Sequence, residues 1–354
     1  MHFSFLFSLL LLVSQSLAAY TIVCDSTQGS TRIENAIKEA INMAKNARDK
    51  LADLAKDTTA AAFEPLFRAS DVDTLSTLYE RVIKIPTSSL QVTFYCDAAF
   101  VDWSDPYSRW LDTAYSYTAK DKSTKSVSLY KVGQDHSKKP GASGSSFSTL
   151  GYQLKLPDGE IADFSNQAHI MINKKRWDPP SNDGLDHRPL GTVNSAGLLE
   201  GYTALDQLKP LSETVFHELI HVVGGTLEAG SGKKKITDDS ISPVVTGKIY
   251  GYAQCVKVNE ARDNIIAIAK NASPLTRAEC PMMLAKGNPK PFEVPISSLK
   301  YADIRCCKAL YLQIKGKATY WSTGDVDKDT LRPAGIPEEP ENNKLKLREI
   351  RWRA

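Results

Sequence analysis

Apolar residues recur every three or four positions in two N-terminal segments, which predicts two amphipathic helices. The first spans Ser30–Lys56, with Ser30 or Thr31 as the expected N-cap. Glu34 follows Thr31 at the spacing of a capping box. The second spans Asp71–Ile85 and is expected to end before Pro86. The apolar face of the first helix is formed by Ile33, Ile37, Ala40, Ile41, Ala44, Leu51 and Leu54.

Alternating apolar and polar positions predict two strands further along the chain. Leu90–Cys96 alternates and is rich in β-forming residues, and a second strand is expected around His169–Ile172. The polar region 104–150 carries no assigned strand, and Lys138–Ser148 reads as a loop. Residues 177–210, rich in Pro and Gly, predict a long loop that builds the wall of a cleft.

Two further helices are expected in the second half of the chain. Leu211–Val223 is helical, with Ser212 as its cap and Gly224-Gly225 as its end. Asn259–Lys270 carries three isoleucines at helical spacing. Helices and a few strands together predict an α+β fold that is rich in helix with a small sheet.

The N-terminus has the pattern of a secretory signal peptide. An apolar stretch from Phe3 to Val13 precedes small residues, which predicts cleavage after Ala18 or Ala19. We therefore expect a signal peptide at 1–19, one domain over 20–315 and a charged, poorly ordered tail at 316–354. The stretch is too short to span a bilayer, so no membrane anchor is expected after cleavage.

Composition narrows the class of protein. The net charge of the chain is only +3, and the sequence lacks the dense clusters of Lys and Arg that nucleic-acid-binding proteins carry. No nucleic acid is therefore expected as a partner. Six cysteines behind a signal peptide predict disulfide bonds and an extracellular location. Asn271-Ala-Ser273 is an acceptor sequence for N-glycosylation. We expect the secreted chain to be a monomer.

The segment His217-Glu-Leu-Ile-His221 contains the pattern H-E-x-x-H. Residues four apart lie on one face of a helix, so both imidazoles can bind one Zn²⁺ ion. Glu218 is expected to act as general base on the attacking water rather than as a ligand. Histidine occurs only six times in the chain, which makes this short pattern more specific.

A third zinc ligand is needed, and the sequence restricts its type. No histidine follows His221, and position 227, where a metzincin would carry one, is Leu227. The third ligand is therefore expected to be a carboxylate. The candidates are Glu228, Asp238, Asp239, Glu260 and Asp263.

The chain resembles the deuterolysin-type zinc endopeptidases, the aspzincins, which are mostly secreted fungal enzymes. In that family H-E-x-x-H is followed by G-T-x-D-x-x-Y-G, and Thr237-Asp238-Asp239 and Tyr250-Gly251 are similar to parts of it. The resemblance covers about residues 20–275. It departs from the family at Ile236, which stands in place of Gly, and in the longer spacing from Asp239 to Tyr250.

The resemblance implies a zincin-like fold, Asp239 as third ligand and Cys24 paired with Cys96. It also implies that Tyr250 donates a hydrogen bond to the tetrahedral oxyanion; the alternative is an ordinary buried tyrosine in a strand. Asp238 stays open as the ligand, as does Glu260, because Asn259-Glu260-Ala-Arg-Asp263 is similar to the ligand helix of gluzincins.

The sequence thus predicts a secreted zinc endopeptidase that acts on protein or peptide substrates. A secreted zinc-binding or protein-binding module on a protease-like scaffold is the alternative. Other polar features have simpler interpretations: Lys174-Lys175-Arg176 is expected to be surface charge, and His136, His169 and His187 to be structural or surface residues.

Overall fold

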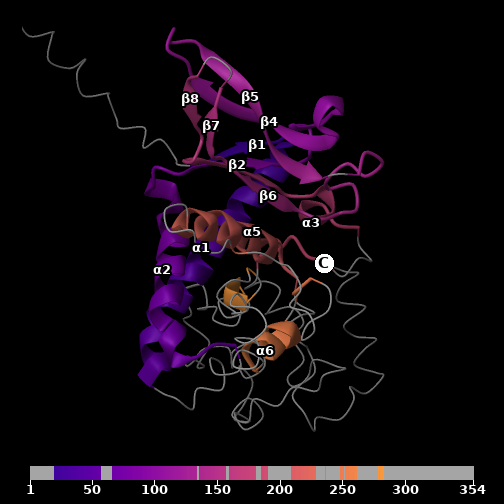
Figure 1. The fold of residues 1–354 in the computed structure, drawn as a ribbon. Helices are drawn as coiled ribbons and strands as arrows, with labels where there is room; N and C mark the ends of the chain where they lie inside the picture. Colours follow the sequence, from indigo (N-terminus) through magenta and orange to yellow (C-terminus); the bar gives the residue numbers. More distant parts are fainter. Residues whose placement is uncertain are drawn as a thin grey trace, which may run out of the picture.

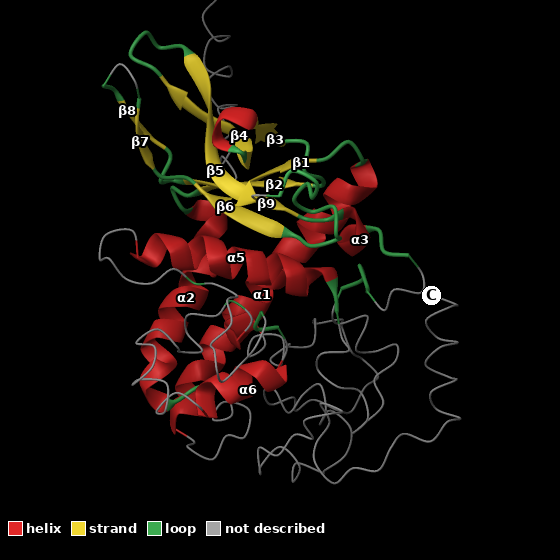
Figure 2. Ribbon diagram, turned by 45° about the vertical axis from the view of Figure 1, so that its right-hand side comes forward, coloured by secondary structure: helices red, strands yellow, loops and turns green. Residues whose placement is uncertain are grey.

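A four-stranded mixed sheet lies between a layer of helices and a second, three-stranded sheet (Figure 1). The computed structural model describes residues 20–56, 66–133, 135–156, 159–180, 185–189, 209–228, 236, 248–250, 252–260, 278 and 280–282. Figure 2 shows α1, α2 and α5 on one side of the larger sheet and the β4–β5 hairpin on the other. The described part of the chain is therefore mixed α+β, as the sequence predicts.

The described helices and strands follow one another along the chain. The strands are β1 (Tyr20–Val23), β2 (Gln91–Tyr95), β3 (Val101–Ser104), β4 (Arg109–Thr118), β5 (Thr124–Gly133), β6 (Phe147–Leu150), β7 (Gln153–Lys155), β8 (Ile161–Asp163) and β9 (Gln167–Met171). The helices are α1 (Thr27–Lys56), α2 (Val72–Lys84), α3 (Lys174–Trp177), α5 (Leu211–Glu228) and α6 (Tyr252–Glu260). Short 3-10 turns lie at Ala69–Asp71, Ile85–Thr87 and Asp105–Tyr107.

The larger sheet has the order β1-β2-β9-β6. β1, β2 and β9 run parallel, and β6 joins β9 in the antiparallel direction at the edge. The crossover from β1 to β2 passes through α1 and α2, as parallel neighbours require. The two predicted strands are confirmed as β2 and β9, which occupy the centre of this sheet.

Side chains of β9 alternate between the two layers. Ala168 and Ile170 face the main core with α1, α2 and α5, whereas His169 and Met171 contact the residues around β3–β5. His169 is buried and its Nδ1 lies 2.8 Å from Asp112 Oδ2 on β4. The sequence-based expectation that His169 is structural is confirmed, because it joins the two sheets.

The prediction for region 104–150 is wrong in part. This region forms the β4–β5 hairpin, and β6 begins inside the expected loop. The hairpin is polar on its outer side because only one face packs on the larger sheet, which leaves a weak hydrophobic pattern. Its buried side is formed by Leu111, Asp112, Tyr115 and Leu129.

Helix α1 begins earlier than its predicted capping box. It starts at Thr27, and Ser26 Oγ accepts a hydrogen bond from the Gly29 amide at 3.2 Å. Ser26 is therefore the cap, and the prediction of Ser30 or Thr31 is wrong. Glu34 pairs instead with Lys38 one turn later, at 2.7 Å. The predicted apolar face is confirmed where side chains are described, with Ile33, Ile37, Ala40, Ala44 and Leu51 buried and Ile41 partly buried. The side chain of Leu54 lies outside the described residues.

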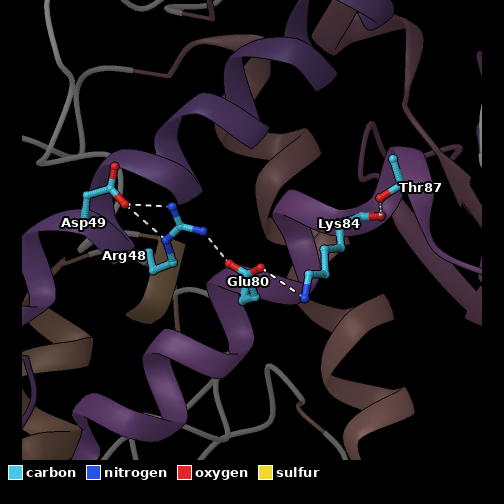
Figure 3. Close-up of polar contacts among 5 residues, drawn as sticks. All are labelled: Arg48, Asp49, Glu80, Lys84 and Thr87. Atoms are coloured by element: carbon cyan, nitrogen blue, oxygen red, sulfur yellow. Dashed lines mark hydrogen bonds and ion pairs between the residues drawn. The ribbon is translucent and has the colours of Figure 1, made fainter.

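Helices α1 and α2 are joined on their outer side by an ionic network (Figure 3). Arg48 on α1 bonds its neighbour Asp49 on the same helix and Glu80 on α2. Glu80 also pairs with Lys84 at 3.2 Å. The hydrogen bond from Arg48, followed by that from Lys84, lowers the pKa of Glu80. Because these side chains stay partly exposed, the network contributes modestly to stability.

Two disulfide bonds lie within the described residues. Cys24 directly after β1 pairs with Cys96 directly after β2, and Cys255 on α6 pairs with Cys280. The first confirms the pairing that the family resemblance implies. The second attaches α6 to the segment around Met282, which is buried in the main core. No helix in the described ranges is both long and apolar enough to traverse a bilayer.

Candidate metal centre

Helix α5 carries the H-E-x-x-H segment and is buried along most of its length. Val215, Phe216, Leu219 and Ile220 are fully buried, and the helix packs against α1, α2 and β6. A helix that is apolar on several sides is stable only between other layers. His217 and Glu218 are therefore held in a protected position, with exposed fractions of 8% and 6%.

The two glycines after Val223 do not end this helix, so that prediction is wrong. α5 continues through Gly224 to Glu228. A Cβ atom on Gly224 would lie 2.2 Å from Cδ1 of Ile236. Gly224 thus allows the chain at Ile236 to approach the helix closely. From the sequence alone, a glycine with this role looks the same as a glycine that ends a helix.

The imidazole rings of His217 and His221 converge. Their Nε2 atoms lie 3.2 Å apart, and the ring planes are inclined at 76°. Two imidazole nitrogens bound to one tetrahedral Zn²⁺ at about 2.0–2.1 Å would lie about 3.3–3.4 Å apart. The pair therefore fits a shared metal ion with little movement of either ring.

The contact made by Nδ1 of His221 indicates which ring nitrogen carries the proton. His221 Nδ1 lies 3.2 Å from the backbone oxygen of Ile236. A carbonyl oxygen only accepts hydrogen bonds, so Nδ1 of His221 donates, and in the neutral ring Nε2 carries the lone pair. This is the arrangement that metal-binding histidines use, in which the outer nitrogen is fixed by a backbone or carboxylate acceptor.

Tyr250 lies beside the pair. Its ring centre is 5.8 Å from that of His217, and 46% of its surface is exposed. The alternative of a buried tyrosine in a strand is wrong, because residues 248–250 form no strand. Lys248 places its Nζ 5.9 Å from the centre of the Tyr250 ring, which adds positive charge near the site.

The predicted third ligand lies outside the described residues. This applies to Asp239, to Asp238 and to Asp263, and to the side chains of Glu228 and Glu260. The predicted helix Asn259–Lys270 overlaps the described α6 only at Asn259 and Glu260. Over the ranges that the structure describes, no group of three or more His, Cys, Asp or Glu side chains is arranged to hold a metal.

Two groups near the site were not singled out by sequence reasoning. One is the Ile236 carbonyl, which no sequence pattern reveals, because any residue carries one. The other is Arg176, which was expected at the surface but is only 8% exposed. Trp177 directly after it is the one local signal of burial, since it also packs in the core.

No protein-family model, no curated protein and no solved structure matches this chain.

Proposed function

We propose that this chain is a secreted zinc-dependent endopeptidase of zincin-like fold that hydrolyses protein or peptide substrates. The observation that supports it most is the convergence of His217 and His221 Nε2 at 3.2 Å on one helical turn. The donor contact from His221 Nδ1 to Ile236 adds to it, because it leaves Nε2 available to a metal ion. The two disulfides are consistent with secretion.

Asp239 is the proposed third ligand. Ile236 contacts α5 and precedes Asp239 by three residues in the sequence. A fully extended chain covers at most about 11 Å over three residues, so a carboxylate is tethered near the imidazole pair. Asp238 shares this tether, and Glu260 is the alternative from α6.

When bound, zinc would polarise the scissile carbonyl and lower the pKa of water at the site. Glu218 would take one proton from the water that attacks the carbonyl carbon. It would then deliver that proton to the amine nitrogen as the carbon–nitrogen bond breaks. Burial of Glu218 keeps competing water away from this carboxylate. The Tyr250 hydroxyl would donate a hydrogen bond to the oxyanion that forms before the bond breaks.

The test compares wild-type protein with Glu218→Gln. We expect wild-type protein to hold one equivalent of zinc and to cleave casein, with cleavage lost on chelation and restored by zinc. Glu218→Gln should keep the zinc and lose roughly 10²–10⁴-fold in cleavage rate, as expected for removal of a general base.

Two results would contradict the proposal. A wild-type protein that binds zinc but cleaves nothing would favour the alternative, a zinc-binding module on a protease-like scaffold. Cleavage that survives both chelation and Glu218→Gln would place the reaction elsewhere in the chain.

A further inference from the structure

Arg176 lies in α3, a single helical turn that is fixed to the larger sheet. Asn173 caps this turn, with its Oδ1 accepting from the Lys175 amide at 3.0 Å. Trp177 Nε1 donates to the backbone oxygen of Cys96 at 3.2 Å, next to the Cys24–Cys96 disulfide. The backbone that carries Arg176 is therefore held in place from both sides.

The Arg176 side chain crosses from this turn to the start of α5. Its Nε donates to Thr214 Oγ1 at 2.6 Å, and its Nη2 lies 3.1 Å from the oxygen of Pro210 and 3.4 Å from that of Lys209. One planar group thus contacts the residues before α5 and its first turn together. The rigid fork of a guanidinium suits such a set of acceptors.

Keeping this cation buried has an energetic cost. Burial lowers the pKa of Arg176, and the nearby negative charge of Glu213 opposes that effect. A guanidinium nevertheless stays charged in proteins, so the charge must be compensated by its hydrogen bonds and by Glu213. An apolar side chain would fill the same space without this cost, which indicates that the contacts themselves matter.

Thr214 precedes His217 by three residues and Glu218 by four, so all three lie on neighbouring positions of adjacent turns. We propose that Arg176 is a positioning residue for the metal centre. It clamps the first turn of α5 to α3 and so fixes the rotation of the helix that presents His217 and Glu218. This inference rests on the proposed zinc peptidase function. Small errors in the placement of reacting groups cost large factors in rate, which makes such a clamp useful.

Thr214 offers a matched set of variants. Thr214→Val removes the acceptor for Arg176 with almost no change in shape, and Thr214→Ser restores it. Arg176→Lys keeps the charge but loses the fork. Thr77→Val on α2 is the control, because the exposed Thr77 hydroxyl donates to the Asp73 oxygen of its own helix and to no other described residue. Each variant is assessed by near-ultraviolet circular dichroism, by zinc affinity against a chromogenic chelator, and by kcat and KM on a peptide.

We expect Thr214→Val and Arg176→Lys to weaken zinc binding about 10-fold or more. Both should lower kcat more than they change KM, because the clamp is proposed to act through His217 and Glu218 and not by contacting the substrate. Thr214→Ser and Thr77→Val should match the wild type in both measurements.

The positioning role is overturned if folded Thr214→Val keeps wild-type zinc affinity and kcat, even if it is less stable. It is also overturned if Thr214→Ser fails to rescue. A wild-type protein that neither holds zinc nor cleaves peptides would instead refute the proposed function, and the positioning role with it. The two failures are therefore distinguished by the wild type alone.

Discussion

His221 Nδ1 lies 3.2 Å from the backbone oxygen of Ile236, fifteen residues further along the chain. Ile236 reaches this position because Gly224, one turn after His221 on α5, has no side chain to keep it away. The orientation of the His221 ring thus depends on the absence of a Cβ atom at Gly224 on the same helix. Ile236 is itself buried in the main core, which holds its carbonyl in place.

Gly224→Ala should destabilise the protein by about 1–3 kcal/mol, although alanine favours helices. The new Cβ would meet Ile236 Cδ1 at 2.2 Å and push the Ile236 carbonyl away from His221. Chemical denaturation measures the loss, and zinc titration should show weaker binding. Ile236→Ala makes room, so the double variant should lose less than the sum of the single losses by about 0.5–3 kcal/mol. Additive losses would contradict the contact.

Zinc should stabilise the folded chain by an amount that grows with the logarithm of the free zinc concentration above the Kd. At a free concentration 100 times the Kd, a ligand specific for the native state adds about 2.7 kcal/mol. His217→Ala should abolish this gain, because it removes one of the two convergent nitrogens. His136→Ala, which alters an exposed histidine, should retain it. Thermal unfolding with and without zinc measures both, and equal gains in the two variants would refute a site at His217.

Asp112 should be essential to the join between the two sheets. It is fully buried, and its Oδ2 accepts from Thr149 at 2.6 Å and contacts His169 at 2.8 Å. Asp112→Ala leaves both partners buried without their acceptor and should cost about 3–5 kcal/mol of unfolding free energy. Asp102→Ala, at an exposed position of β3, is the control and should stay within about 0.5 kcal/mol. Equal losses in denaturant unfolding would contradict the structural role of the network.

The Glu80 network should stabilise the protein only while its carboxylate is ionised. The pKa of Glu80 is lowered below its ordinary value of 4.5, so the folded state favours the charged form. The contribution is therefore present at neutral pH and is lost as the pH falls below 4.5 through the depressed pKa. Because solvent screens these partly exposed side chains, Glu80→Gln should cost under about 1 kcal/mol at pH 7.

Denaturant unfolding from pH 7 to pH 2 tests this dependence. The difference between wild type and Glu80→Gln should shrink toward zero at the acid end, and 1 M salt should reduce it at pH 7. A difference that is constant with pH would show that Glu80 acts through packing rather than charge.

Local patterns in the sequence decide those features that depend on neighbours within one turn. The apolar face of α1 and the strand β2 follow from periodicity, because a 3.6-residue or two-residue repeat can bury one face only in the matching structure. The shared face of His217 and His221 follows in the same way, since a four-residue spacing is one helical turn.

Contacts between distant segments decided the rest. The sequence pattern favours Ser30 or Thr31 as the cap of α1, whereas the helix begins at Thr27 and the Gly29 amide donates to Ser26 Oγ. The hairpin β4–β5 escaped prediction because its polar outer face and its buried Asp112 depend on a sheet formed by other residues. Likewise, the sequence around Gly224 does not show whether the helix ends there or whether another segment packs against the glycine.

The sequence by itself determined that a histidine pair and a glutamate share one helix, because that relationship is set by backbone geometry over five residues. Only the tertiary structure decided which nitrogen of His221 is turned toward its partner and that Arg176 is inside. Both depend on long-range contacts, with Ile236 in one case and with Thr214 in the other. A chain specifies such contacts through the packing of its whole core, not through any local pattern of residues.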